Sequence, residues 1–145
     1  MSEHRIGREI RSLNNAIRRE VDNSPVKRKI DDITGTNGWI IGYIARNLER
    51  DIYQRDIEKE FGITRSTASK VLILMEKKGL VERVSVPHDA RLKKLVLTQK
   101  SLELAEMMHT DANQIEARLI KGFTEDELKT FSDYILRMKK NMQRS

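Results

Sequence analysis

The sequence contains no cysteine, only two prolines, and few aromatic residues, which make up 5% of the chain. Without cysteine there is no disulfide bond, thiolate nucleophile, thiol redox sensor or cysteine-ligated metal. The scarcity of aromatic residues argues against an RNA-binding surface built on base stacking. No apolar run approaches the roughly 18–20 residues that a membrane span needs, and residues 1–11 lack the apolar segment of a secretory signal. These absences favour a soluble cytoplasmic protein.

The chain has 145 residues and a mass of 16.9 kDa, within the usual size of a single domain. It contains 28 lysine and arginine residues against 22 aspartate and glutamate residues, for a net charge of +6 and a pI near 9.6. The excess is greatest in residues 61–100, which contain nine basic and three acidic side chains. This segment favours an anionic partner such as nucleic acid, although chance clustering on a solvated face gives the same count.

Hydrophobic spacing predicts helices in the first half of the chain. In the first helix, apolar residues recur every three or four positions, at Ile6, Ile10, Leu13, Ile17 and Val21. Pro25 is expected to end this pattern, with residues 27–32 forming a short charged connector. The apolar run of residues 39–48 predicts a helix buried on most sides, and residues 53–61 predict a short helix stopped by Gly62.

The second half predicts three more helices and one β-hairpin. Thr64 is a good N-cap for a helix that Gly79 ends. Residues 80–86 and 92–97 are rich in β-forming residues and flank the polar tip 87–91. Thr98 begins a long helix, closed by Gly122, with a stripe at Leu102, Ala105, Met108, Ala112, Ile115 and Leu119. Thr124 begins the last helix with capping-box spacing, and its stripe is Leu128, Phe131, Ile135, Met138 and Met142. The predicted fold class is therefore mainly α.

The two helices joined at Gly62 have the outline of a helix-turn-helix, whose second helix enters the major groove of DNA. The outer face of this second helix presents cations and short hydroxyl side chains near its amino end: Arg65, Ser66, Thr67, Ser69 and Lys70. Such groups bond base edges and phosphates without steric bulk. The same composition also fits an ordinary surface helix, so this motif alone leaves both interpretations open.

The predicted hairpin follows directly and adds a second group of polar residues: His88, Asp89, Arg91, Lys93 and Lys94. An arginine at a hairpin tip is well placed to enter a minor groove, where narrow A·T-rich stretches concentrate negative potential. We expect Asp89 to hold the Arg91 guanidinium by a bidentate bond and so to fix its direction. Lys93 and Lys94 are predicted phosphate contacts, whereas His88 fits a DNA contact and a solvated loop residue equally well.

Residues 53–98 resemble the winged helix-turn-helix of MarR-type transcriptional regulators. The matching features are Gly62, Ser66-Thr67-Ala68-Ser69-Lys70, Glu76-Lys77-Lys78-Gly79-Leu80-Val81, and Asp89-x-Arg91 followed by Leu97-Thr98. The helical order on either side fits as well, so the resemblance covers nearly the whole chain. Two positions depart from the family pattern. Ser101 replaces the usual glycine, and Leu74 stands where a polar or basic residue, and with it a phosphate contact, is common.

The resemblance implies a homodimer whose interface is formed by the helices at both chain ends. Residues 1–34 would be the amino-terminal dimerisation helix and connector, 35–98 the DNA-binding region, and 99–145 the carboxy-terminal dimerisation helices. The helices can also pack on one another within a monomer. Family members often bind small aromatic or phenolic acids between the two regions, which points to Trp39, Tyr43 and the pair Met107-Met108. From spacing alone, these residues fit a hydrophobic core equally well.

Other chemistry finds little support in the sequence. His4, His88 and His109 are far apart and do not have the spacing of metal ligands. The acidic pair Asp31-Asp32 lies in the expected connector, and the acids at residues 125–127 begin a helix, where carboxylates favour the positive end of the helix dipole. No nucleophile elbow, P-loop or dinucleotide-binding fingerprint is present. We therefore predict neither an enzyme nor a cofactor.

The leading hypothesis is a sequence-specific regulator of transcription that binds double-stranded DNA as a homodimer at a pseudo-palindromic operator. A small ligand would release it from DNA, and repression of its own or neighbouring genes is the expected outcome. A non-specific architectural DNA-binding protein would show the same basic hairpin and helix. A protein-interaction module would use the long helices as its docking face and would need no affinity for DNA.

Overall fold

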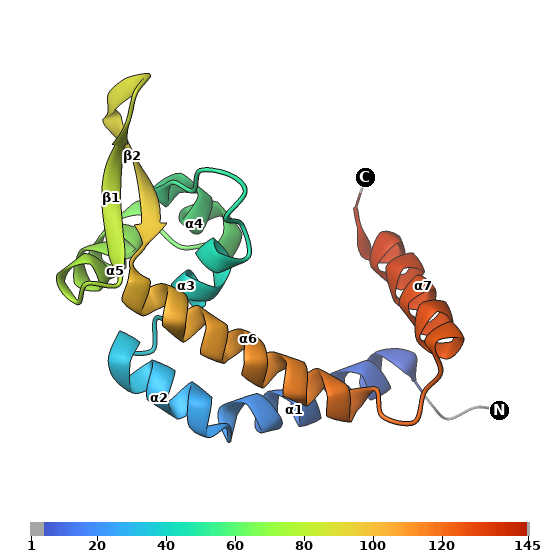
Figure 1. The fold of residues 1–145 in the computed structure, drawn as a ribbon. Coiled ribbons are helices and arrows are strands. Elements are labelled where there is room, and N and C mark those ends of the chain that lie inside the picture. Colours follow the sequence, from blue (N-terminus) through green and yellow to red (C-terminus); the bar gives the residue numbers. More distant parts are fainter. Residues whose placement is uncertain (1–4, 145) are drawn as a thin grey trace.

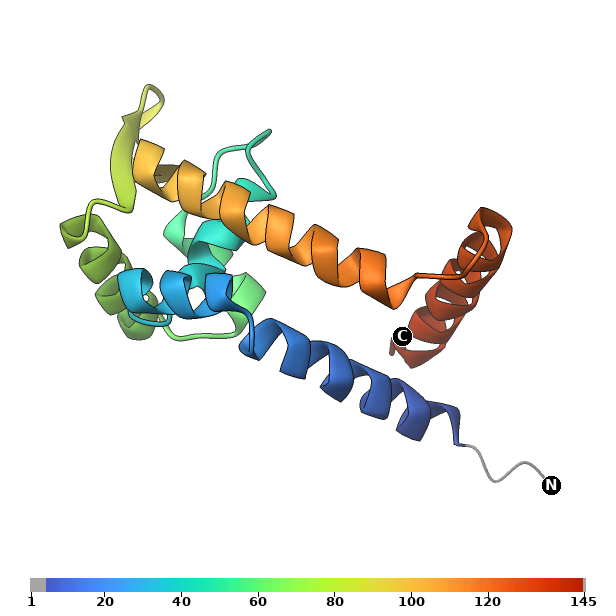
Figure 2. The same ribbon diagram turned by 60° about the horizontal axis from the view of Figure 1, so that its bottom comes forward.

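The computed structural model describes residues 5–144, which form seven helices and one antiparallel hairpin (Figure 1). The elements are α1 (Ile6–Asp22), α2 (Pro25–Thr34), α3 (Gly38–Ala45), α4 (Gln54–Phe61), α5 (Arg65–Lys77), β1 (Val81–Val86), β2 (Asp89–Leu97), α6 (Gln99–Leu119) and α7 (Glu125–Met142). This confirms the mainly α class. Figures 1 and 2 show α3, α4, α5 and the hairpin gathered at one end, with α1 and α6 extending away from them and α7 standing apart.

Helix α2 replaces the connector that was predicted for residues 27–32, so that prediction was wrong. Pro25 does interrupt the first helix, but it then occupies the first turn of a new one, where its missing N–H is not needed. The Ser24 hydroxyl caps this turn by accepting from the backbone N–H of Val26 at 3.1 Å. Ile30 of α2 is buried against α3 and α6. Most of its neighbours in the sequence are charged, so the short apolar face of α2 gives no clear helical pattern.

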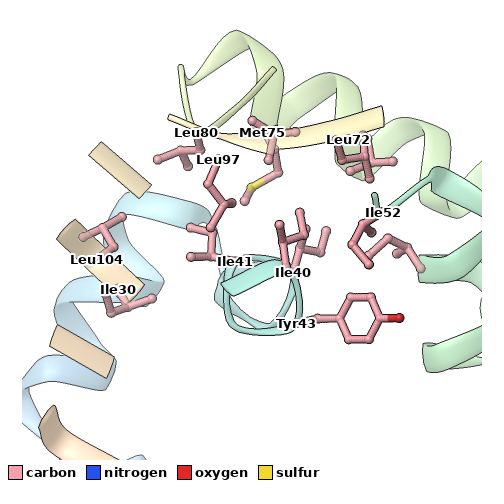
Figure 3. Close-up of a cluster of buried hydrophobic side chains, with 14 residues drawn as sticks. Ile30, Ile40, Ile41, Tyr43, Ile52, Leu72, Met75, Leu80, Leu97 and Leu104 are labelled. Atoms are coloured by element: carbon pink, nitrogen blue, oxygen red, sulfur yellow. The ribbon is translucent and has the colours of Figure 1, made fainter. Parts of the chain in front are cut away.

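The hydrophobic core is built around α3, as the apolar run predicted. Ile40 and Ile41 are completely buried and lie among side chains of α2, α5, α6 and both strands (Figure 3). Two glycines permit this close packing: a Cβ at Gly38 would lie 2.6 Å from Ile30 Cγ2, and one at Gly42 would lie 3.3 Å from Met108 Cε. Leu48, which ends the apolar run, lies beyond the end of α3 and is exposed.

The hairpin forms where predicted, but β2 begins at Asp89, within the segment expected to be the tip. The strands pair in register from Val81 opposite Leu97 to Ser85 opposite Lys93, and a register shift follows at Val86. The turn therefore consists of residues 87–88. The Leu95 N–H donates to the Ile52 carbonyl at 2.7 Å, which fastens the hairpin to the segment before α4.

Helix α6 joins this region to the far end of the chain. Its start is fixed by Ser101, whose buried hydroxyl donates to the Leu80 carbonyl, and by Leu104, which is buried in the core. The stripe predicted for α6 runs beside these two residues and includes the exposed Leu102 and Leu119. Helix α7 leaves most of its apolar side chains exposed, with Met142 at 82%.

Candidate nucleic-acid interface

The amino end of α5 is organised by its N-cap, Thr64. The Thr64 hydroxyl accepts from the backbone N–H of Thr67 at 3.2 Å and donates to the Thr67 hydroxyl at 2.9 Å. The Ser66 hydroxyl lies 3.2 Å from the same oxygen. All three side chains are exposed. The first turn of α5 thus presents a fixed group of hydroxyls to solvent, beside backbone N–H groups at the positive end of the helix dipole.

The two faces of α5 differ as the sequence predicted. Ala68, Leu72 and Met75 are completely buried, and Figure 3 shows Leu72 and Met75 directed toward the core residues of α3. The opposite face carries the residues predicted to contact DNA, of which Ser69 is half-buried and four are exposed: Arg65, Ser66, Thr67 and Lys70. The polar outer face of α5 therefore points away from the hydrophobic core and is available to a partner.

The turn between α4 and α5 sets the direction of α5. Gly62 adopts a left-handed conformation with φ of 60°, which ends α4, and the Ile63 N–H donates to the Glu58 carbonyl at 3.1 Å. Glycine tolerates this conformation because it has no Cβ. Gln54, at the start of α4, donates through Nε2 to the Arg65 carbonyl at 3.3 Å. The starts of the two helices are thereby held together.

On the hairpin, Asp89 and Arg91 are close, but the predicted bidentate bond is wrong. A single contact joins Arg91 Nε to Asp89 Oδ1 at 3.7 Å, and the Arg91 side chain is 95% exposed. The carboxylate instead accepts from the backbone N–H of Arg91 at 2.9 Å. A two-residue spacing at a strand start favours this local backbone bond, which occupies the oxygen that a bidentate pair would require. Asp89 shapes the hairpin through this backbone bond, and its loose contact with the guanidinium leaves the Arg91 side chain exposed.

The two lysines of β2 lie on opposite faces of the hairpin, because successive side chains of a strand alternate. Lys93 Nζ donates to the Ser85 hydroxyl of the facing strand at 2.6 Å. Lys94 Nζ lies 3.7 Å from Asp51 Oδ1, on the other side. His88 is exposed in the turn. Of these three residues, only Lys93 lines the same groove as Arg91.

A groove of about 430 Å³ lies between α4, the start of α5 and the hairpin. It brings together three predicted residues, Arg65, Arg91 and Lys93, with two that the sequence analysis did not identify, Arg55 and Arg83. Its lining residues are Tyr53, Gln54, Arg55, Glu58, Arg65, Arg83, Arg91, Leu92, Lys93 and Leu95. Five cations and one carboxylate therefore face the same groove, which makes it a strong attractor for polyanions.

Arg83 has an unusual environment in this groove. Its Nε lies 3.7 Å from Glu76 Oε2 of α5. Both Nε and Nη2 are buried and have no hydrogen-bond partner. Strand alternation places Arg83 on the same face as Val81 and Leu95, and this spacing was the signal that could have identified it. Nε and Nη2 therefore have unused hydrogen-bonding capacity, which an anion in the groove reaches only if the side chain moves.

A second hollow, of about 580 Å³, lies between the α1–α2 segment, α3 and α6. Trp39 lines it, together with five residues of the predicted α6 stripe: Leu102, Ala105, Met108, Ala112 and Ile115. Tyr43 does not line it; this residue is buried, and its hydroxyl accepts from Arg50 Nη2 at 2.7 Å. Both aromatic residues pack against Phe61, Trp39 with a centroid distance of 4.3 Å. Met107 lines a smaller neighbouring hollow.

Residues 5–144 contain neither a cluster of metal ligands nor a helix that could span a membrane. No group of three or more histidine, cysteine, aspartate or glutamate residues there is arranged to hold a metal ion. His109 lines the 580 Å³ hollow, and His4 lies outside the described residues. In the same part of the chain, no helix is long and apolar enough to cross a membrane.

The short α4, the turn at Gly62, α5 and the following hairpin define a winged helix-turn-helix, in which α5 is the recognition helix and the hairpin is the wing. A family model described as the MarR family matches residues 31–92. The chain is 31% identical in sequence to the transcription regulator MarR from Oenococcus oeni PSU-1. Its structure matches the crystal structure of that protein with a TM-score of 0.63, over 94% of this chain and 99% of that one. The chain belongs to the MarR family of transcription regulators.

Other solved structures share the fold. The MepR–DNA complex from S. aureus is 23% identical, with a TM-score of 0.73, over 99% of this chain and 100% of that one. The heme sensor protein PefR, solved with heme and carbon monoxide, is 25% identical with a TM-score of 0.58. It covers 93% of this chain and 92% of that one. The predicted winged helix-turn-helix fold is thus confirmed over nearly the full chain.

Proposed function

We propose that this protein is a ligand-responsive repressor that binds a pseudo-palindromic operator in double-stranded DNA as a homodimer. The main support is the groove in which α4, the recognition helix and the wing place five cations beside an exposed face of hydroxyls. Cations neutralise phosphates, and hydroxyls with long cationic side chains also read base edges. The similar proteins include the transcription regulator MarR from Oenococcus oeni and MepR from S. aureus, which was solved in complex with DNA, and both agree with this assignment.

In the proposed complex, the outer face of α5 lies in the major groove. Five side chains contact bases and phosphates there: Arg65, Ser66, Thr67, Ser69 and Lys70. Arg91, free of a tight partner, extends from the wing into the adjacent minor groove, with His88 beside it. Asp89 acts by holding the wing backbone.

The backbone of the DNA passes over the groove between these two contacts. Arg55, Arg83 and Lys93 bind phosphates in the groove. Lys94 contacts a phosphate only if it leaves Asp51, because its contact with Asp51 holds it on the other face. Lys93 and Lys94, although adjacent in sequence, therefore differ in their contribution.

The homodimer is supported by apolar surface that the single chain leaves open. Ile6, Ile10 and Leu13 of α1 are exposed, as are Phe131 and Leu136 of α7. Helix α7 stands apart from the rest of the molecule in both views (Figure 1, Figure 2), which does not support packing within a monomer. We propose that residues 1–34 and 99–145 form the dimer interface and that 35–98 bind DNA. Two-fold symmetry would set the recognition helices about 34–36 Å apart.

The 580 Å³ hollow is the proposed ligand site. Its volume and its apolar lining with a few polar groups are typical of small-molecule pockets. We propose a small aromatic or phenolic ligand that contacts Trp39, with buried Tyr43 supporting the wall through Phe61. Because α3 belongs to the DNA-binding region and α6 to the dimer region, a ligand between them favours one spacing of the recognition helices. It then shifts the population away from the DNA-bound form.

This proposal makes the protein a binding protein and not an enzyme, active in the cytoplasm where the chromosome of a bacterium lies. It is tested by selecting bound fragments from random duplex DNA at a stated salt concentration, with and without phenolic acids. We expect a selected site to bind at least about 10³-fold more tightly than random duplex, and a phenolic acid to weaken that binding. Binding within about tenfold of random duplex identifies an architectural protein, and no binding at low salt refutes a DNA-binding function.

A further inference from the structure

Ile73 is an unexpected residue on the outer face of the recognition helix. Its side chain is 46% exposed, although isoleucine is among the residues most often buried in proteins. Ala68, Leu72 and Met75 already fill the contact between α5 and the core, and all three are completely buried. Ile73 is therefore not needed to fasten α5 to the domain, and its exposed surface requires another explanation.

The position of Ile73 on the helix is informative. Successive residues of an α-helix are about 100° apart around the axis, so positions 66, 70, 73 and 77 form one stripe. This stripe lies opposite Met75, which Figure 3 shows directed toward the core. Lys70 and Lys77 lie one turn to either side of Ile73, and both are exposed. Ile73 is thus an apolar residue in the middle of a basic stripe.

Only one apolar group on the base edges of the major groove can match such a residue. Base pairs present hydrogen-bond donors and acceptors there, together with the C5-methyl group of thymine. Ile73 lies seven residues beyond Ser66, or about 10 Å along the helix axis. The rise of DNA is roughly 3.4 Å per base pair, so an α5 inclined to the DNA axis in the major groove places Ser66 and Ile73 over different base pairs, up to about three apart. A thymine at that spacing is within reach when Lys70 and Lys77 contact the flanking phosphates.

We propose that Ile73 is a specificity-determining residue that packs against the C5-methyl group of a thymine in each operator half-site. This inference rests on the proposed function, because a contact with thymine requires that the outer face of α5 lies in the major groove. It adds a base identity to that contact, since cytosine and the purines lack the methyl group. A recognition helix with only hydroxyls and cations along this stripe would have no apolar means of distinguishing thymine from cytosine.

Leu74 provides a matched control on the same helix. It is adjacent in sequence, is apolar, and has a similar exposure of 40%. Its side chain leaves the helix about 100° around the axis from Ile73, at the edge of the outer face. Truncation of Leu74 removes a similar amount of exposed apolar surface without changing the centre of the stripe.

The experiment replaces individual thymines by uracil in the selected operator, which removes only the methyl group. Removing a buried methyl contact weakens binding by about fourfold, as expected for the burial of one such group. We expect this loss at one thymine in each half-site for the unaltered protein. Ile73→Ala should bind the thymine duplex about fourfold per half-site more weakly and should no longer distinguish thymine from uracil there. Leu74→Ala and Ile73→Val should retain the distinction.

The outcomes separate this inference from the proposed function. If the unaltered protein binds every uracil-substituted operator as tightly as the thymine operator, Ile73 does not read a methyl group. The same conclusion follows if Ile73→Ala retains the full thymine preference. DNA binding itself persists in both cases, so the proposed function stands. Loss of all duplex binding by the unaltered protein would remove both proposals, and unchanged melting temperatures of the variants confirm that each one folds.

Discussion

Replacing Arg91 by alanine removes a cation from the wing while changing little else in the folded chain. Its side chain is 95% exposed, and its single contact with Asp89 spans 3.7 Å. Exposed ion pairs of this kind add little to stability. The bond that shapes the wing uses the Arg91 backbone N–H, which alanine keeps. Arg91→Ala should therefore leave the melting temperature and the oligomeric state unchanged.

The expected effect on DNA binding is large, because the proposed homodimer inserts two copies of Arg91. An arginine bound bidentately to guanine contributes about 1–3 kcal/mol; the same range for each Arg91 gives about 2–6 kcal/mol for the dimer. This corresponds to a loss of affinity of at least about 30-fold for the selected operator. The loss should be greatest for operators with an A·T-rich segment under the wing, where the minor groove is narrow.

The assay is a fluorescence-anisotropy titration of the selected operator at several salt concentrations. Arg118→Ala is the charge control, because it removes the same charge from an exposed arginine of α6 far from the wing. Light scattering establishes that this variant remains a dimer after losing its pair with Glu20 of α1. The control should lose little affinity. Equal losses for Arg91→Ala and Arg118→Ala would mean that only net charge matters, and unchanged affinity of Arg91→Ala would exclude the wing from DNA binding.

Three further predictions concern the supporting structure. Gly38→Ala should lower the free energy of unfolding by about 1–3 kcal/mol, because the new Cβ would lie 2.6 Å from Ile30 Cγ2 in the packed core. Urea titrations measure this loss. An unchanged urea midpoint would show that α2 and α3 can move apart without cost. Ser101→Ala should destabilise the protein by about 0.5–1.5 kcal/mol, because the Leu80 carbonyl loses its hydroxyl donor and keeps only the long bond from the Thr98 N–H at 3.5 Å. Full stability would mean that the Thr98 N–H or water replaces the hydroxyl. Deletion of residues 124–145 should give a monomer or an unstable chain in light scattering, and a stable dimer would contradict the proposed role of α7.

The elements that the sequence predicted best are those whose signals are local. Thr64, Thr98 and Thr124 cap α5, α6 and α7, and Gly62 and Gly79 take the positive φ angles expected after a helix. Helix α2 was missed because charged residues surround its short apolar face and because Pro25 ends one helix while starting the next. The starting point of β2 was misplaced because a two-residue turn leaves no signal in the polar segment 87–91.

Only the part of the candidate site that depends on local sequence signals was predicted. The outer face of α5 follows from helical periodicity, and it is exposed as expected. Arg55 and Arg83 were not identified, because they come from α4 and β1 and meet the predicted cations only when those elements pack. Tyr43 was grouped with Trp39 by its spacing, yet the packing of Phe61 places only Trp39 at the hollow.

Periodicity, caps and turn glycines determined which segments become helices or strands and which side of α5 is polar, since these depend on neighbours within a few residues. Tertiary structure decided which charges share a groove, that Lys93 and Lys94 separate, and that the apolar faces of α1 and α7 stay uncovered in a single chain. The reason is that Coulomb and packing energies depend on distances between elements far apart in sequence. The sequence supplied the charges, and only the fold set the distances between them.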